Sequence, residues 1–125
     1  MAGTHGARVT RDVEPDALRD LLEHPPRATV AFVRDGVPDV LPARAHLGGT
    51  HRFAVAADVA PDLNDREVVL VVDDGPYWFQ LRGVSVRGTA RRTAEPAGPP
   101  AAHLAWYTLE PRRILAWDYA TVRVA

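Results

Sequence analysis

Residues 28–47 read ATVAFVRDGVPDVLPARAHL, and this stretch decides the fold class. Asp35-Gly36 is a strong signal for a two-residue hairpin, because both central positions of such a turn favour positive φ. Apolar and β-branched residues precede the turn, and a second strand follows it. Pro38 and Pro42 cannot donate hydrogen bonds, so this second strand should lie at an edge or carry a bulge. The sequence therefore predicts an antiparallel hairpin.

The second strand, residues 37–47, has two different faces, because alternate side chains point to opposite sides of a strand. One face is apolar and predicts barrel interior; it consists of Leu41, Ala43, Ala45 and Leu47. The other face carries Arg44 and His46 beside Val40 and Pro42. Arginine and histidine at this spacing form either plain surface or the wall of a ligand groove.

Further strand-like runs follow, separated by turns and short connections. They cover residues 51–56, 67–73, 77–93 and 114–124. The run VVLVV within 67–73 is typical of a strand buried on both faces. The run 77–93 predicts one long strand, or two strands with a bend at Gly83. About six antiparallel strands predict a small closed barrel, because closure removes exposed edges.

Two or three short helices are expected between these strands. Pro15 suits a first helical turn, and residues 17–22 carry an apolar stripe at helical spacing until a Pro-Pro pair stops it. Residues 57–66 have loop and short-helix character. Residues 101–109 predict another short helix, ended by the next proline.

Length and composition predict one globular domain over residues 13–125, preceded by a loosely held segment at 1–12. Apolar residues make up 46% and charged residues 25%, which excludes a disordered chain. The net charge of −1 argues against nucleic acid and acidic membranes as partners. No apolar run reaches membrane length and no secretion signal is evident, so a cytoplasmic location is expected.

The sequence also excludes several kinds of chemistry. It has no cysteine and no lysine, which excludes thiolate metal sites, disulfides and lysine Schiff bases. The single serine, Ser85, lies in a strand pattern and not in a nucleophile elbow. The five histidines lack metal-ligand spacing, so no metal site is expected.

Several ordered segments carry a family resemblance. They are ATVAFV (28–33), DGVP (35–38), PAR (42–44), VVLVVDD (68–74), LRGVSVRGTA (81–90), PRRI (111–114) and WDY (117–119). In this order, over about residues 13–121, the chain resembles the pyridoxamine 5′-phosphate oxidase-like split-barrel flavoproteins, and in particular their short actinobacterial members. The resemblance implies a mainly β, six-stranded antiparallel split barrel that forms a homodimer, with FMN at the subunit interface.

The resemblance also implies particular site residues. In the family, the strand that matches residues 40–46 lines the flavin, which makes Arg44 and His46 candidate cofactor-binding residues. An arginine there suits a phosphate or the electron-rich edge of the flavin. Arg82, on the long strand, is a further candidate.

The expected phosphate loop departs from the family pattern. Flavin-binding members carry hydroxyl and basic residues after the strand that matches 51–56. This chain has Ala57 and Asp58 at the start of that stretch, and the acid would repel a phosphate. Both positions therefore belong to the candidate cofactor site, but the usual phosphate donors are missing.

Three functions stay open. The first is an oxidoreductase that uses FMN or the related deazaflavin coenzyme on a small-molecule substrate, which needs no acid or base side chain. The second is a barrel that has lost the usual FMN binding and binds haem or a metabolite, or catalyses a cofactor-independent reaction in the same groove. The polar side chains that act on the ligand or in the reaction would then be His46, His51 or His103. The third is a dimeric scaffold without chemistry.

Overall fold

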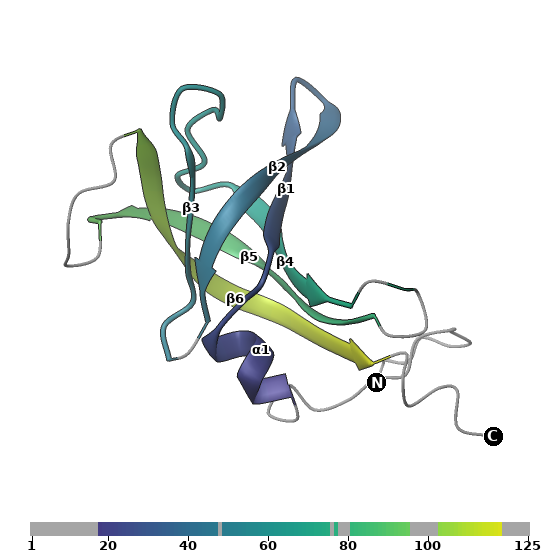
Figure 1. Ribbon diagram of the computed structural model, residues 1–125. Helices are drawn as coiled ribbons and strands as arrows, with labels where there is room; N and C mark the ends of the chain where they lie inside the picture. Colours follow the sequence, from purple (N-terminus) through teal and green to yellow (C-terminus); the bar gives the residue numbers. More distant parts are fainter. Residues whose placement is uncertain (1–17, 48, 76, 78–80, 96–102, 119–125) are drawn as a thin grey trace.

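Six antiparallel strands close into a barrel in the computed structural model, which describes residues 18–47, 49–75, 77, 81–95 and 103–118 (Figure 1). The strands are β1 (Ala28–Arg34), β2 (Val37–His46), β3 (Arg52–Ala56), β4 (Glu67–Asp74), β5 (Arg82–Thr93) and β6 (Leu104–Asp118). Their order around the barrel is β1-β2-β3-β6-β5-β4. The predicted fold class is confirmed. The loosely held segment predicted at 1–12 lies outside the described residues.

The β1–β2 hairpin forms as the sequence predicts. Asp35 and Gly36 both have positive φ, at 53° and 79°, and Arg34 is in register with Val37 across the turn. The apolar face of β2 packs on the core, whereas Arg44 and His46 are exposed on the other face.

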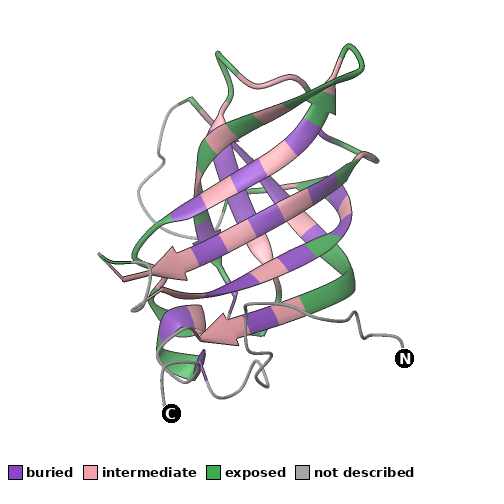
Figure 2. Cartoon of the chain, turned by 90° about the vertical axis from the view of Figure 1, so that its right-hand side faces the viewer, coloured by how far each residue is buried: buried purple, intermediate pink, exposed green. Residues whose placement is uncertain are grey.

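Every strand contributes side chains to the core inside the barrel, and burial alternates most regularly along β1 and β4 (Figure 2). Its largest fully buried side chains include Phe53, Leu70 and Tyr107. The short helix α1 (Arg19–Glu23) covers the barrel end opposite the β1–β2 turn (Figure 1). Leu18 and Leu21 pack there into the core, which confirms the apolar stripe for the described part of the predicted helix.

The helix predicted over residues 101–109 is wrong where the structure describes the chain. Residues 104–118 form the single long strand β6, which pairs with β3 on one side and with β5 on the other. Ala105, Tyr107 and Leu109 alternate into the core. Pairing with two neighbouring strands outweighs a local helical pattern. Pro111 is tolerated because it lies at a β-bulge, where a missing N–H costs little.

Two further details differ from the sequence prediction. Residues 57–66 form turns and irregular backbone, so within the described residues α1 is the one α-helix. The strand β4 is not buried on both faces. Val68, Leu70 and Val72 are in the core, whereas Val69 and Val71 are half-buried on the outside of the barrel. The reason is that no described element covers this side.

Candidate ligand-binding site

Small and apolar side chains cover the outside of five strands. The strand register aligns them in two rows: Pro42, Thr29, Val71, Ser85 and Leu115 in one row, and Val40, Ala31, Val69, Arg87 and Arg113 in the other. We call these ten residues the outer face. A contiguous apolar surface of this kind is typical of a place where another molecule binds.

Two hollows lie next to each other on the outer face. The larger, about 220 Å³, lies between the β1–β2 hairpin and β4, and its lining includes Ala31 and Val33. The smaller, about 110 Å³, is lined by Val69, Ser85, Arg87, Arg113 and Leu115. Both hollows share Val69 and Arg87, so they form a continuous depression.

A second region lies where β2 meets β3 and β6. Arg44 is in register with Ala54, which is in register with Trp106, and His46 is in register with Arg52. The His46 ring stacks on Trp106 with the ring centroids 5.7 Å apart and the planes at 21°. We call Arg44, His46, Arg52 and Trp106 the cationic patch.

The cationic patch holds hydrogen-bond donors without acceptors. In the part of the chain that the structure describes, neither Arg44 nor Arg52 takes part in an ion pair. Arg52 Nε and Trp106 Nε1 are buried without a hydrogen-bond partner. Leaving a buried donor unpaired costs about 1–3 kcal/mol. Both atoms are covered by protein, so a ligand with anionic oxygens would instead bind the accessible parts of the Arg44 and Arg52 side chains through charge-assisted hydrogen bonds.

Arg82 lies in a different environment from Arg44. Its guanidinium donates to Asp20 of α1 at 2.7 Å and to Asp74 of β4 at 3.1 Å. Hydrogen bonds from Arg82 hold the pKa of Asp20 and of Asp74 below the usual value. Two carboxylates therefore already compensate this arginine, and it ties the helix to the barrel end.

Ala57 and Asp58 lie at the start of the turn segment 57–66, and both are exposed. The backbone N–H of Ala57 donates to the carbonyl of His103 at 2.6 Å, and the N–H of Val59 donates to the carbonyl of Ala56 at 3.3 Å. Amides used in this way cannot also hold a phosphate. The guanidinium of Arg34 reaches this segment and donates to the carbonyl of Val59 at 3.0 Å, but it also pairs with Asp39. This arginine is therefore already compensated and does not replace the missing phosphate donors.

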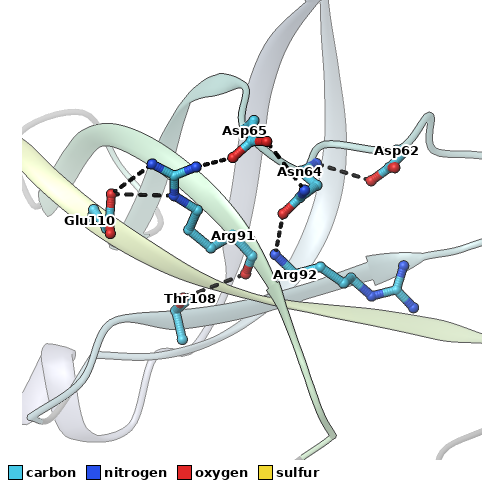
Figure 3. A network of polar contacts seen from close by, with 7 residues as sticks. All are labelled: Asp62, Asn64, Asp65, Arg91, Arg92, Thr108 and Glu110. Carbon is cyan, nitrogen blue, oxygen red and sulfur yellow. Dashed lines mark hydrogen bonds and ion pairs between the residues drawn. The ribbon is translucent and has the colours of Figure 1, made fainter.

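A polar network fixes the later part of the same segment (Figure 3). The side-chain oxygen of Asn64 accepts the backbone N–H of Arg92 at 2.7 Å, and Asp65 forms an ion pair with Arg91. Arg91 also contacts Glu110 of β6 at 3.4 Å. These contacts connect the segment to β5 and, through Arg91, to β6, so Asp65 stabilises the position of the segment on the barrel.

No group of metal-ligating side chains comes together among the described residues. His51 is half-buried on the connection before β3, and burial lowers its pKa by disfavouring the charged form.

Sequence reasoning missed Arg52, Trp106 and Arg113 as site residues. Arg52 and His46 belong to adjoining strands, and their pairing could be anticipated from the turn between them. Trp106 and Arg113 lie on the part of β6 that precedes the strand predicted at 114–124, and the sequence predicted a helix over much of that part. Their positions depend on pairing with β3 and β5, which no local pattern reveals.

Comparison with known proteins identifies the fold. No family model matches the sequence, and no curated protein matches it. Similar solved structures include the FAD binding protein from Mycobacterium smegmatis, with 18% identity and a TM-score of 0.66, covering 86% of this chain and 98% of that one. A conserved hypothetical protein from Mycobacterium tuberculosis has 20% identity and a TM-score of 0.71, with 98% and 94% covered. A Corynebacterium glutamicum protein provisionally named pyridoxamine 5′-phosphate oxidase has 17% identity and a TM-score of 0.63, with 87% and 97% covered.

At these identities the likeness establishes the split-barrel fold. Within the described residues, no helix has the length and hydropathy that crossing a membrane requires.

Proposed function

We propose that this protein is a flavin-binding oxidoreductase that holds the phosphate end of its cofactor at the cationic patch. The observation that carries the proposal is the pair of guanidiniums, Arg44 and Arg52, that lie on neighbouring strands without a carboxylate partner among the described residues. Flavin-binding neighbours of the same fold support it. The residues that would hold the phosphate differ from those expected from the sequence, because Ala57 and Asp58 are unsuited to a phosphate and Arg82 is paired with carboxylates.

The residues present fit an anionic flavin. Two guanidiniums without a carboxylate partner match the charge of a phosphate monoester, and the planar fork of arginine suits its oxygens. His46 offers a flat ring on an exposed strand, already stacked on an indole. The apolar outer face, reached along β2 from Arg44 through Pro42, would exclude water from a bound ring system.

When bound, a flavin supplies the hydride chemistry, so the chain itself needs no acid or base. The tasks of the described residues are to anchor, orient and exclude water. Arg44 and Arg52 would anchor the phosphate, and the half-buried Val69, Val71 and Leu115 would give an apolar floor. Ser85 would offer the one side-chain hydroxyl in the smaller hollow.

We further propose that two copies of the chain pair through the outer face. Val40 of the outer face is 57% exposed, and Val33, which is 53% exposed and in register with Pro38, continues the rows of the outer face along the β1–β2 hairpin. Exposed valines beside half-buried ones make a surface that favours association. A second copy would turn the open hollows into enclosed pockets at the interface.

A titration of the purified protein with FMN and with riboflavin tests the cofactor assignment. Bound flavin is followed by its fluorescence and by its visible absorbance, and the deazaflavin coenzyme is tested in parallel. We expect FMN to bind at least tenfold more tightly than riboflavin, because only FMN offers the phosphate to the patch. Arg44→Gln should remove this preference, whereas Arg19→Gln, at an exposed arginine of α1, should keep it. Equal affinity for FMN and riboflavin would contradict the proposal.

A further inference from the structure

A β-bulge brings three arginines together beside the smaller hollow. Arg87 is in register with Arg113, but its neighbour Gly88 is in register with Pro111, so Arg112 is an extra residue on β6. The strands approach so closely at this point that a Cβ on Gly88 would overlap the carbonyl oxygen of Glu110. Bulges of this kind redirect side chains and are common next to binding sites.

Two of these three arginines share one carboxylate. Glu67 forms an ion pair with Arg87 at 3.1 Å and another with Arg112. Arg113 is exposed and has no ion-pair or hydrogen-bond partner in the described part of the chain. Glu67 is thus already committed to two arginines, and Arg113 remains without an acceptor.

The surroundings of Arg113 are apolar on the side of the hollow. Val69 and Leu115 form the floor, and Ser85 adds one hydroxyl. The adjoining larger hollow continues this floor with Ala31 and Val33. The two volumes, about 110 and 220 Å³, are of the order that accepts a single aromatic ring, since a cavity of roughly 150 Å³ binds benzene.

We infer that the smaller hollow is a binding site for a small apolar molecule that carries one carboxylate, with Arg113 as its anchor. The planar guanidinium of Arg113 suits a carboxylate, which it can hold through two parallel hydrogen bonds. Arg87 would contribute positive charge while it stays bonded to Glu67. The apolar body of the ligand would lie on Val69 and Leu115. Its anchor, Arg113, is separate from the cationic patch, but its floor of Val69 and Leu115 is the one proposed for the flavin ring, so the two ligands would compete for it. Binding of the carboxylate itself does not require a flavin.

Benzoate and its uncharged counterpart benzamide test this inference. Each is titrated into ¹⁵N-labelled protein without flavin, at constant ionic strength, and amide shifts are followed by NMR. We expect benzoate to shift the amides of Val69, Ser85 and Leu115 and to bind at least about tenfold more tightly than benzamide, because only benzoate offers a charge-assisted hydrogen bond. Equal binding of the two compounds would overturn the inference.

Arg113→Gln and Arg19→Gln form a matched pair of variants. The first should weaken benzoate binding at least about tenfold and leave benzamide unchanged, and the second should change neither. Unchanged benzoate affinity in Arg113→Gln would overturn the inference. Loss of self-association in Arg113→Gln, together with equal binding of benzoate and benzamide to the wild type, would also overturn the inference. Arg113 would then pair with a carboxylate of a second copy. Arg113→Gln should bind FMN with the same affinity as the wild type. The benzoate titration and the FMN titration therefore test the carboxylate site and the cofactor proposal separately.

Discussion

Tyr107→Phe should destabilise the protein through one buried hydrogen bond. The Tyr107 hydroxyl accepts the backbone N–H of Leu63 at 3.1 Å, and both residues are almost completely buried; the hydroxyl also donates to Asp62 Oδ1 in a longer contact of 3.5 Å. Phenylalanine keeps the ring and its stacking on Phe53, with the ring centroids 5.3 Å apart. The substitution therefore removes the acceptor without opening a large cavity. A buried N–H left without an acceptor costs about 1–3 kcal/mol, which corresponds to a fall in Tm of roughly 3–6 °C per kcal/mol for a domain of this size.

Urea unfolding at a fixed protein concentration measures this effect, because the midpoint of an associating protein depends on concentration. Asp62→Asn is the control. Asp62 is exposed, and the variant keeps an oxygen that can accept both from the backbone N–H of Asn64 and from the Tyr107 hydroxyl, so its free energy of unfolding should change by less than about 0.5 kcal/mol. Hydrogen exchange should also become faster at the Leu63 amide in Tyr107→Phe. An unchanged midpoint together with slow exchange at Leu63 would refute the assignment of this bond.

Three further predictions follow from other contacts. Gly36→Val should lower the free energy of unfolding by about 1–2 kcal/mol, because a β-branched residue is strained at a φ of 79°. No atom lies within 4 Å of the added Cβ, so the effect comes from the backbone conformation. An unchanged melting midpoint would contradict this prediction. Arg82→Gln should lower Tm at neutral pH, and the difference from wild type should shrink as pH falls below about 4. The reason is that the pKa values of Asp20 and Asp74 are lowered in the folded protein, so their contribution to stability is present above the unfolded value of 3.8 and is lost on protonation. A difference in Tm that persists in acid would refute the stabilising role of the ion pairs between Arg82 and these two carboxylates. Val40→Asp should weaken self-association in light scattering by placing a charge in an apolar contact, and an undiminished dimer would remove β2 from the proposed interface.

The strands that are held together by local turns could be predicted from the sequence. Asp35-Gly36 fixes the β1–β2 register within a few residues, and the alternation along β2 then separates the core face from the face of Arg44 and His46.

The features that depend on distant partners could not be predicted. Leu104 to Leu109 has a local pattern compatible with a helix, and only pairing with β3 and β5 makes it a strand. Arg82 is 62 residues away from Asp20 in the sequence, so no spacing rule could show that the Asp20 carboxylate binds the Arg82 guanidinium. The position of Arg113 depends on a bulge, whose location requires knowing both strands.

An NMR titration of ¹⁵N-labelled protein with FMN tests the central claim most directly, because the indole N–H of Trp106 gives its own resonance. Trp106 Nε1 has no acceptor in the described structure. We predict that FMN shifts this indole signal and the amides of Arg44, His46 and Arg52, and that riboflavin shifts them much less. Saturable FMN binding that shifts the amides of residues 57–60 and leaves the Trp106 indole and Arg44 unchanged would contradict the account.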